Sequence, residues 1–426
     1  MKKDKNKARP APGKLQRTSN ISLVPRSPET IWIIEPHDPL IVRDGRPFGP
    51  DPSARAISLS FPFPSTTTGG VRTREGLKAD GRFDVSQIER VKQIKVRGPL
   101  LVQVAPGEDK IERWLVRAPA DALLLESEKK DHVLCKRLVP LKLYAGAETA
   151  SIHGDASLML VGPVKSDRNK PSKEAPLYWY WGTFQKWLVA PSDHEQPLVS
   201  LGLSGPSREH RLHVSMNPDT LTAKDGALFE TSGLEFTSPG RDNKTRLSGA
   251  RRLALAVVVD RRETSGIVAG LASLGGERRM VSWRSRSDND LPNCPPDLLA
   301  AIVKQKACRV VLLTPACFEQ GYRPGWLVEP RDGVQPSLQA IAIQRPQIVS
   351  GWRLEHPAGP KPTRRLAPSG TVLFLSLTGD NQAIEQWVKG IWMQCISDKV
   401  EDRNDGFGLA VLGSWSGQAG KMQEEK

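Results

Sequence analysis

Long apolar segments are missing from this chain of 426 residues. No run of about 18 consecutive apolar residues occurs, so we expect no membrane-spanning helix. The first 20 residues are basic but lack the apolar segment that a secretory signal needs. Both absences favour a cytoplasmic protein.

Cysteine is scarce as well, with five residues that form no C-x-x-C pair. An odd number of scattered cysteines gives neither a disulfide framework nor the ligand spacing of a structural zinc site. We therefore expect reduced thiols at Cys135, Cys294, Cys308, Cys317 and Cys395.

Motifs for cofactor and metal chemistry are also absent. There is no G-x-x-x-x-G-K-[ST] loop, and Gly406, Gly408 and Gly413 have the wrong spacing for a dinucleotide site. Neither G-x-S-x-G nor H-E-x-x-H occurs. His37 and Asp38 lie between two prolines in a predicted turn, where an HD-type metal site is not expected. The sequence predicts no cofactor and no metal.

Positive charge is present in excess, with a formal net charge of +14. Residues 1–28 contain eight Lys or Arg residues and one Asp, which gives 8 − 1 = +7, half of this excess. We expect this segment to be a flexible arm, either a solvated tail or a sequence-independent contact to polyphosphate. The basic character of the whole chain favours a nucleic-acid partner.

The order of strand-like and helix-like segments predicts the fold class. The second half contains the order strand, helix, strand, strand, helix, strand, which is the split βαβ arrangement of a ferredoxin-like fold. These segments are 251–260, 295–305, 308–315, 369–377, 381–397 and 407–415. The first half shows a looser version, with a strand at 30–36 and a helix that Ser65 caps. We therefore expect an α+β protein of two ferredoxin-like (RRM-like) modules with long loop and hairpin insertions.

Domain boundaries follow from this pattern. We place a basic arm at 1–28, an N-terminal module at 29–245, a C-terminal module at 246–418 and a polar tail at 419–426. Within the first module we expect an aromatic helix over 176–190, and paired strands over 208–217 and 226–236.

Four pairs of arginines lie beside turns or glycines in both halves of the chain. A single pair is most often part of a solvated surface, whereas four pairs predict an extended groove that follows phosphates, since the planar guanidinium suits phosphate and base edges. The pairs are Arg43 and Arg46, Arg72 and Arg74, Arg278 and Arg279, and Arg364 and Arg365.

The glycines near the C-terminus allow two interpretations. Gly406 and Gly408 are ordinary turn residues, or they let a nucleic-acid strand approach the backbone closely because no Cβ intervenes. The segment around them resembles an RNP1 strand but departs from it at Asp405 and Leu412. This departure weakens an expectation of base stacking there.

Six segments in order closely resemble one family, the third subunit of type III-B CRISPR effector (Cmr) complexes, which belongs to the RAMP superfamily. The similarity spans about residues 30 to 415. The segments are EPHDPLIVRDGRPFG (35–49), SFPFPSTTTGGVRT (60–73), RLHVSMNPDTLTAKDGALFETSGLEF (211–236), LGGERRMVSW (274–283), SGWRLEHPAGPKPTRRLAPSGTVLFLSL (350–377) and GFGLAVLG (406–413).

This resemblance implies a non-catalytic protein of antiviral defence that binds the 5′ handle of the crRNA. It further implies a position between the large polymerase/cyclase-like subunit and the backbone RAMP subunits, and no homo-oligomer of its own. Arg43, Arg46, Arg72, Gly276, Gly406 and Gly408 match motif positions of the family. The remaining candidates rest on charge and turn context, and the proline-rich run 61–64 is expected to be structural or to pack on a partner subunit.

Two other functions stay open from the residues. One is a metal-independent endoribonuclease of the same superfamily that processes crRNA, with His210 or His213 as general acid. A strand places these two side chains on opposite faces, and a structural or RNA-facing role is the more common one for such histidines. The other is an RNA-binding protein outside CRISPR systems.

Overall fold

The computed structural model describes residues 29–43, 55–56, 58–105, 110–143, 158–238, 250–260, 269–286, 291–350, 352–353, 359–360 and 362–421. The expected basic arm at 1–28 lies outside these residues.

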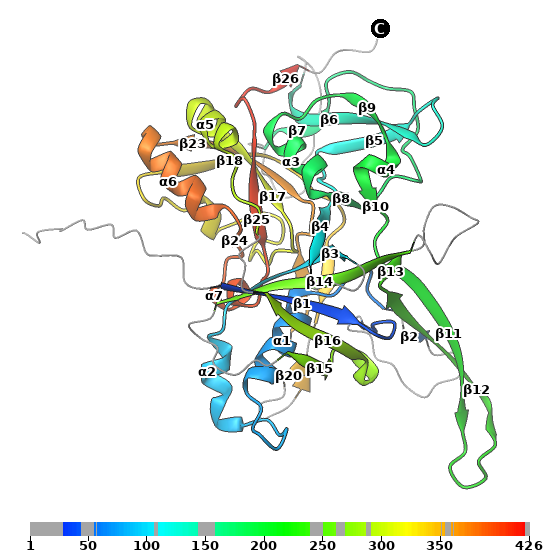
Figure 1. The fold of residues 1–426 in the computed structure, drawn as a ribbon. Coiled ribbons are helices and arrows are strands. Elements are labelled where there is room, and N and C mark those ends of the chain that lie inside the picture. The colour runs from blue at the N-terminus through cyan, green and yellow to red at the C-terminus, as the bar shows by residue number, and fades with distance from the viewer. Residues whose placement is uncertain are drawn as a thin grey trace, which may run out of the picture.

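A nine-stranded sheet forms the lower half of the molecule as drawn in Figure 1. Its main path has the order β10-β8-β4-β3-β14-β1-β16-β15, and β13 pairs with β14. The strands are β1 (Glu29–Pro36), β3 (Val96–Val104), β4 (Ile111–Arg117), β8 (Tyr178–Tyr180), β10 (Gly202–Leu203), β13 (Thr237–Ser238), β14 (Arg251–Asp260), β15 (Gly270–Ser273) and β16 (Met280–Arg286).

Four central strands of this sheet make the first ferredoxin-like module. Helices α1 (Pro64–Glu75) and α2 (Ile88–Lys92), with the 3₁₀ turn η1 (Val85–Gln87), connect β1 to β3, and β14 lies between these two strands. Along the chain, β1 is the first of these four strands, β3 the second, β14 the third and β16 the fourth. Their order in the sheet, β3-β14-β1-β16, is thus second, third, first and fourth, as in a ferredoxin-like sheet. The sheet of the first module thus includes β14 to β16, which follow the expected boundary at residue 246.

A five-stranded antiparallel sheet makes the second module, with the order β18-β23-β17-β25-β24. Its first four strands repeat the order second, third, first and fourth. Helices α5 and α6 pack on β25, and α5 also contacts β17. The elements are α5 (Pro296–Gln305), β17 (Ala307–Leu312), β18 (Gln335–Ala342), β23 (Val372–Thr378), α6 (Asn381–Ile391), β24 (Gln394–Cys395), α7 (Val400–Asn404) and β25 (Leu409–Ser414).

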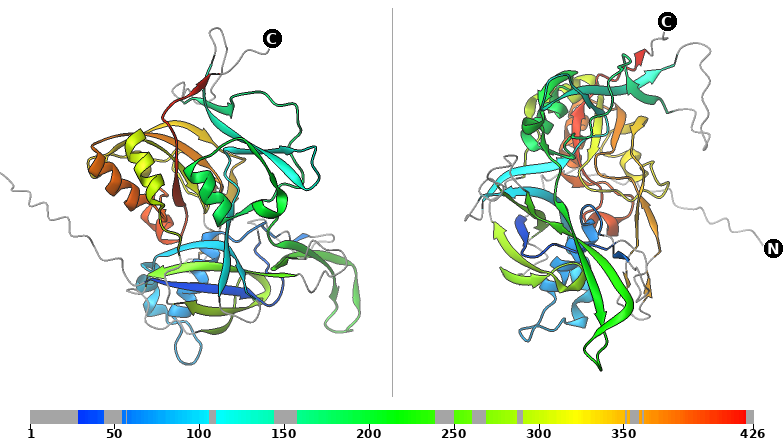
Figure 2. Two further views of the ribbon diagram at one scale, coloured as in Figure 1. Left: turned by 45° about the horizontal axis from the view of Figure 1, so that its top comes forward. Right: turned by 90° about the vertical axis from the view of Figure 1, so that its right-hand side faces the viewer.

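The long insertion of the first module builds a hairpin and most of a third sheet, to which β26 near the end of the chain adds a strand. The third sheet has the order β26-β6-β5, and β7 and β9 also pair with β6. Its elements and the adjoining helices are β5 (Ala122–Glu126), β6 (His132–Lys142), β7 (Leu160–Pro163), α3 (Trp181–Val189), β9 (His194–Pro197), α4 (Leu198–Leu201) and β26 (Gly420–Lys421). The hairpin β11 (Ser207–Met216) and β12 (Ala223–Glu235) extends away from the sheets, and β2 (Arg55–Ala56) pairs with β12 (Figures 1 and 2).

Several short elements complete the fold. They are η3 (Gly276–Arg278) in the turn before β16, η4 (Trp326–Val328), β19 (Gln347–Val349), β20 (Trp352–Arg353), β21 (Gly359–Pro360) and β22 (Arg364–Leu366). Strand β19 pairs with β22, and β20 pairs with β21.

Strand β1 is buried on both faces, which explains its nearly continuous apolar sequence. Ile31 and Ile33 belong to the large core shared with the second module and α3. Trp32 and Ile34 point to the opposite face, where they pack in a second core with Val71 of α1. The nine-stranded sheet is therefore the layer that joins the two cores.

The predicted α+β class with two ferredoxin-like modules is confirmed. The predicted helix after Ser65 is α1, although it begins at Pro64 and Ser65 does not cap it. The aromatic segment 176–190 is strand β8 followed by helix α3, and the helix predicted over 381–397 ends at Ile391. Across the part of the chain that the structure describes, no helix has the length and apolarity to cross a membrane.

Candidate nucleic-acid interface

Arg43 and Gly276 lie side by side. Arg43 is exposed, and a Cβ built on Gly276 would lie 3.7 Å from its Cδ atom. The Gly276 N–H donates to the Ile41 carbonyl oxygen at 2.7 Å, which holds the two segments together. Arg46 lies outside the described residues, so the structure brings together two of these three predicted residues.

The other arginines of this region differ in exposure. Arg278 is exposed at a positive φ of 51°, whereas Arg279 pairs with Glu277 at 2.9 Å. The Arg74 guanidinium lies 5.3 Å from the ring centre of Trp283, and burial lowers the pKa of Arg74. Arg278 is thus the one of these three whose side chain faces solvent most openly.

Arg72 is occupied by contacts within the protein. Its Nη1 atom lies 2.6 Å from Oδ1 of Asp405, and Nη2 donates to the carbonyl oxygens of Lys92 at 3.0 Å and Ile94 at 3.2 Å. The side chain is only 18% exposed. This guanidinium therefore connects α1, the turn before β3 and the glycine-rich loop before β25.

Gly406 and Gly408 pack closely against the protein itself. Both have positive φ values, 93° and 82°. A Cβ on Gly406 would come within 2.7 Å of the Gly98 carbonyl oxygen, and one on Gly408 within 2.8 Å of the Ser397 nitrogen. Both glycines are thus required by the contact of this loop with neighbouring backbone.

Arg364 and Arg365 point in different directions from β22. Arg364 forms an ion pair with Asp402 and lies 5.4 Å from the ring centre of Phe407. Arg365 is exposed, pairs across the ribbon with Ile348, and lines a surface cavity. Of this pair, Arg365 is placed where a ligand can reach it.

Three neighbouring cavities have lining residues in common, and we call them together the arginine–aromatic groove; the first lies between the two modules. The first and second cavities share Ser60, Phe61, Arg117, Tyr178, Gln347 and Ser369. The second and third share Gln344. The second adds Arg345, and the third adds Arg365, Arg323 and Tyr322.

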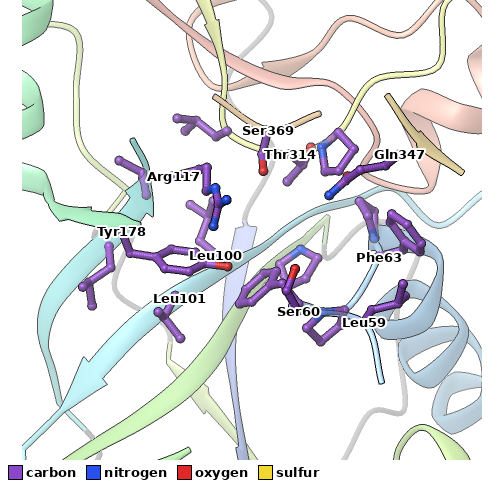
Figure 3. A pocket seen from close by; sticks show the side chains of 18 of the residues that line it. Leu59, Ser60, Phe63, Leu100, Leu101, Arg117, Tyr178, Thr314, Gln347 and Ser369 are labelled. Atoms are coloured by element: carbon purple, nitrogen blue, oxygen red, sulfur yellow. The ribbon is translucent and has the colours of Figure 1, made fainter. Parts of the chain in front are cut away.

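The first cavity places aromatic and polar groups around one space (Figure 3). Arg117 and Tyr178 pair across β4 and β8 and reach in from one side, with the guanidinium 5.5 Å from the ring centre. Phe61 packs on Tyr178 at a centroid distance of 5.6 Å. Gln347 extends from the opposite side. Burial raises the pKa of Tyr178 to about 12, although Arg117 lies nearby, so its hydroxyl stays protonated at neutral pH.

The same aromatic and cationic pairing continues along the sheet. Arg113 lies on the same face of β4 as Arg117, and its guanidinium is 4.7 Å from the ring centre of Tyr180. Arg251 donates to the Tyr180 hydroxyl at 2.6 Å. The pairing of arginine with tyrosine thus continues beside the groove, with Tyr178 and Tyr180 each only 6% exposed.

Charge distinguishes this groove from a large cavity beside Trp326. Among the described residues that line the groove there are four arginines and no carboxylate, a formal charge of +4. That cavity is lined by four cations and three carboxylates, a net charge of 4 − 3 = +1. The groove is therefore the stronger attractor for a polyanion.

Helix α1 adds a further favourable charge. It begins at Pro64, which lines the first cavity, and its first turn contains no acidic residue. The N-terminal end of a helix carries partial positive charge, which favours an anion there. The proline-rich run 61–64 is accordingly a wall of the groove.

Sequence reasoning missed most of the groove. Arg117, Tyr178, Arg345 and Gln347 were not predicted, because they lie in three segments that only the fold brings together. One signal was present: Arg113 and Arg117 have the spacing of one strand face, opposite a run of alternating tyrosines.

The two histidines considered for catalysis lie on the exposed hairpin. His210 contacts Glu230 at 2.6 Å, while His213 contacts the hydroxyl of Thr231 at 2.9 Å and stacks on Phe229. Within the described ranges, no group of three or more His, Cys, Asp or Glu side chains is arranged to hold a metal ion.

The model of one protein family matches residues 32–415, and its description is CRISPR-associated protein (Cas_Cmr3). The chain belongs to this family. Membership confirms the predicted relation to type III CRISPR effector subunits.

Solved structures with similar folds share little sequence with this Cas_Cmr3 family member. A chain in a cryo-EM structure of the type III-B Cmr-beta complex bound to cognate target RNA and AMPPnP is 12% identical, with a TM-score of 0.40 over 85% of this chain and 88% of that one. A chain of the Csm3-Csm4 subcomplex of a type III-A interference complex is 9% identical, with a TM-score of 0.32 over 82% and 94%. No curated protein sequence matches the chain.

Proposed function

We propose that this Cas_Cmr3 family member is a non-catalytic crRNA-binding subunit that holds the 5′ handle of the crRNA in the arginine–aromatic groove. The observation that carries this proposal is a set of three neighbouring cavities with four arginines and no carboxylate among their described lining residues. Arginines supply sequence-independent contacts to phosphates, and Phe61, Tyr178 and Tyr322 supply surfaces for unpaired bases.

In this proposal, the chain is the third subunit of a type III-B complex and bridges the large polymerase/cyclase-like subunit to the backbone RAMP subunits. Family membership supports this role. The hairpin adds a surface suited to a partner subunit, because Leu212, Val214 and Met216 alternate along β11 and are 71%, 43% and 54% exposed.

RNA affinity measured at several salt concentrations tests the groove. For single-stranded RNA, the logarithm of the association constant falls linearly with the logarithm of the salt concentration. The slope is about −0.7 per neutralised phosphate. Four arginines thus predict a slope of about −2.8, and the double variant Arg345→Gln, Arg365→Gln predicts about −1.4 with roughly tenfold weaker binding at 0.15 M salt. Fluorescence anisotropy with a labelled handle RNA gives both quantities.

A matched variant controls for net charge. Arg168 and Lys173 are exposed and line none of the three cavities, so Arg168→Gln, Lys173→Gln removes the same two charges elsewhere. We expect it to keep the wild-type slope. Equal losses of RNA affinity in both double variants would reject the groove as the binding site. A non-catalytic role would be rejected if the protein cleaved the RNA at one site without metal and lost this activity in His210→Ala or His213→Ala.

A further inference from the structure

We propose that the cavity beside Trp326 binds one acidic side chain, Asp or Glu, from an otherwise uncharged segment of another protein subunit. In this contact the carboxylate pairs with Arg331 and Arg403. The inference rests on the proposed place of the chain in a complex with other subunits, but it needs no RNA in the arginine–aromatic groove.

The cavity lies between the two modules and shares no lining residue with the groove. The first module contributes the starts of β1 and β3 and the end of β14, and the second contributes α6, β24 and α7 (Figure 1). Arg97 joins the two modules beside it, since its Nη1 atom donates to the Met393 carbonyl oxygen at 2.6 Å while its guanidinium pairs with Glu29. A volume of about 650 Å³ leaves room for one side chain and the adjoining main chain.

Two guanidiniums lie against the same tryptophan ring in this cavity. The Cζ atom of Arg331 is 3.6 Å from the ring centre of Trp326, and the Cζ atom of Arg403 is 4.5 Å from it. The two charges therefore lie within about 8 Å of each other, which is the screening length at physiological salt. Burial lowers the pKa of Arg403, and the charge of Arg331 lowers it further. A bound anion relieves this repulsion between like charges.

Both guanidiniums keep donors that the protein itself does not use. Arg331 Nη2 donates to the Trp326 carbonyl oxygen at 2.9 Å, and Arg403 Nη1 donates to the carbonyl oxygens of Ser397 and Asp398, each at 2.6 Å. These contacts orient the two side chains. Within the described part of the chain, Nε and the other Nη atom of each arginine have no partner, and none of these four nitrogens is closed off from solvent.

The nearest acidic side chain is already in use. The carboxylate of Asp398 accepts the N–H groups of Glu319 at 2.8 Å, Gly325 at 2.8 Å and Trp326 at 3.0 Å. Among the described residues, neither Arg331 nor Arg403 forms an ion pair with a carboxylate. The site thus has two oriented cations and lacks an anion of its own.

Asn404 adds a polar group to the same cavity. It follows Arg403 in α7, lines the cavity and is only 8% exposed. Its side-chain amide has no hydrogen-bond partner among the residues that the structure describes, and neither amide atom is closed off from solvent. Gln386 and Gln394 line the cavity as well and are exposed. These amides can donate to and accept from the main chain of a bound segment.

The charges of the cavity favour a single carboxylate over a phosphate chain. Glu29, Asp260 and Asp332 also line it, and they repel the successive phosphates of an RNA strand. One carboxylate in an uncharged segment brings no further negative charge near them, and a guanidinium binds a carboxylate through paired hydrogen bonds. Tryptophan and arginine are also the residues that most often dominate the binding energy of protein interfaces. We therefore assign the cavity to a protein segment.

Carbodiimide crosslinking in the assembled complex tests this contact. The full chain with Arg331→Lys is combined with crRNA and the other purified subunits of its complex, and the carbodiimide joins a lysine to a carboxylate in direct contact with it. We expect mass spectrometry to find a crosslink between the introduced lysine and an Asp or Glu of another subunit.

Two double variants measure the strength of the contact. Arg331→Gln, Arg403→Gln should weaken binding of the chain to the other subunits, measured by biolayer interferometry, by about tenfold or more, because it removes charge-assisted hydrogen bonds. Arg168→Gln, Lys173→Gln removes two charges from exposed positions outside the cavity and should leave this affinity within about twofold. If the first variant does not fold, as judged by circular dichroism, the crosslink of Arg331→Lys, which keeps the charge, tests the same contact.

The outcomes separate this inference from the proposed function. An assembled complex in which the introduced lysine joins no carboxylate of another subunit would overturn the acidic contact and leave the RNA-binding groove in place. Equal weakening by the two double variants, or RNA crosslinked to peptides of this cavity, would also overturn it. A wild-type chain that does not join the other subunits would overturn the proposed function, and this inference with it.

Discussion

Replacing Arg72 separates a structural role from an RNA-binding role. Arg72→Met removes an ion pair to Asp405 and two hydrogen bonds to main-chain oxygens, while the methionine retains the apolar stem. The two side chains are 18% and 22% exposed, so the loss is larger than for a surface pair. Hydrogen bonds to a charged group are worth about 1.5–3 kcal/mol, and we expect a loss of about 2–3 kcal/mol in the free energy of unfolding.

Thermal unfolding measures this loss. An unfolding entropy of about 2.1 cal/mol/K per residue gives about 0.9 kcal/mol/K for 426 residues, so Tm should fall by about 2–3 °C. Arg365→Met, which removes an exposed guanidinium, should change Tm by less than about 1 °C. RNA affinity of folded Arg72→Met should stay near the wild-type value. An unchanged Tm together with lost RNA binding would refute this reasoning and return Arg72 to the RNA-binding residues.

Two further predictions concern contacts that join the modules. Arg309→Met should destabilise the protein by about 3–5 kcal/mol, because it leaves the fully buried Asp121 carboxylate without its cation. The double variant Asp121→Asn, Arg309→Met removes this carboxylate as well and should recover part of the loss in the same thermal assay. Gly406→Ala should lower Tm, because φ of Gly406 is 93° and the new methyl group would meet a backbone oxygen. The control is Gly182→Ala in α3, where a new Cβ would meet no neighbouring atom within 4 Å. This substitution should leave Tm unchanged or raise it. Equal effects of the two alanines would contradict the close packing of the loop before β25.

The sequence predicted the elements whose apolar pattern is strong and local. Helix α6 was expected because its apolar residues recur with helical spacing, and strands β17 and β25 because they lie in short, mostly apolar runs. The third sheet was not expected, because its strands other than β6 have five residues or fewer and β26 joins it from the far end of the chain. Strand β14 joins the first module because its faces match β1 and β3. It pairs with β1 across more than 200 residues and with β3 across well over 100 residues, which no local pattern reveals.

The candidate site was harder to predict for a related reason. Arginines beside turns were a sound guide to exposed cations such as Arg43 and Arg365. The same rule also selected Arg72 and Arg364, whose carboxylate partners come from the distant loop 398–406. Charge in a sequence does not show which cations the fold will neutralise. The roles of the predicted arginines toward RNA stay predictions, and the variants above test those of Arg72 and Arg365.

Crosslinking of RNA to the groove tests the central claim most directly. A handle RNA with 4-thiouridine at single positions, bound to the full chain and irradiated, should form adducts with peptides that contain Phe61, Tyr178 or residues 343–349, as identified by mass spectrometry. Adducts confined to the mixed-charge cavity beside Trp326, with none in the groove, would contradict the account.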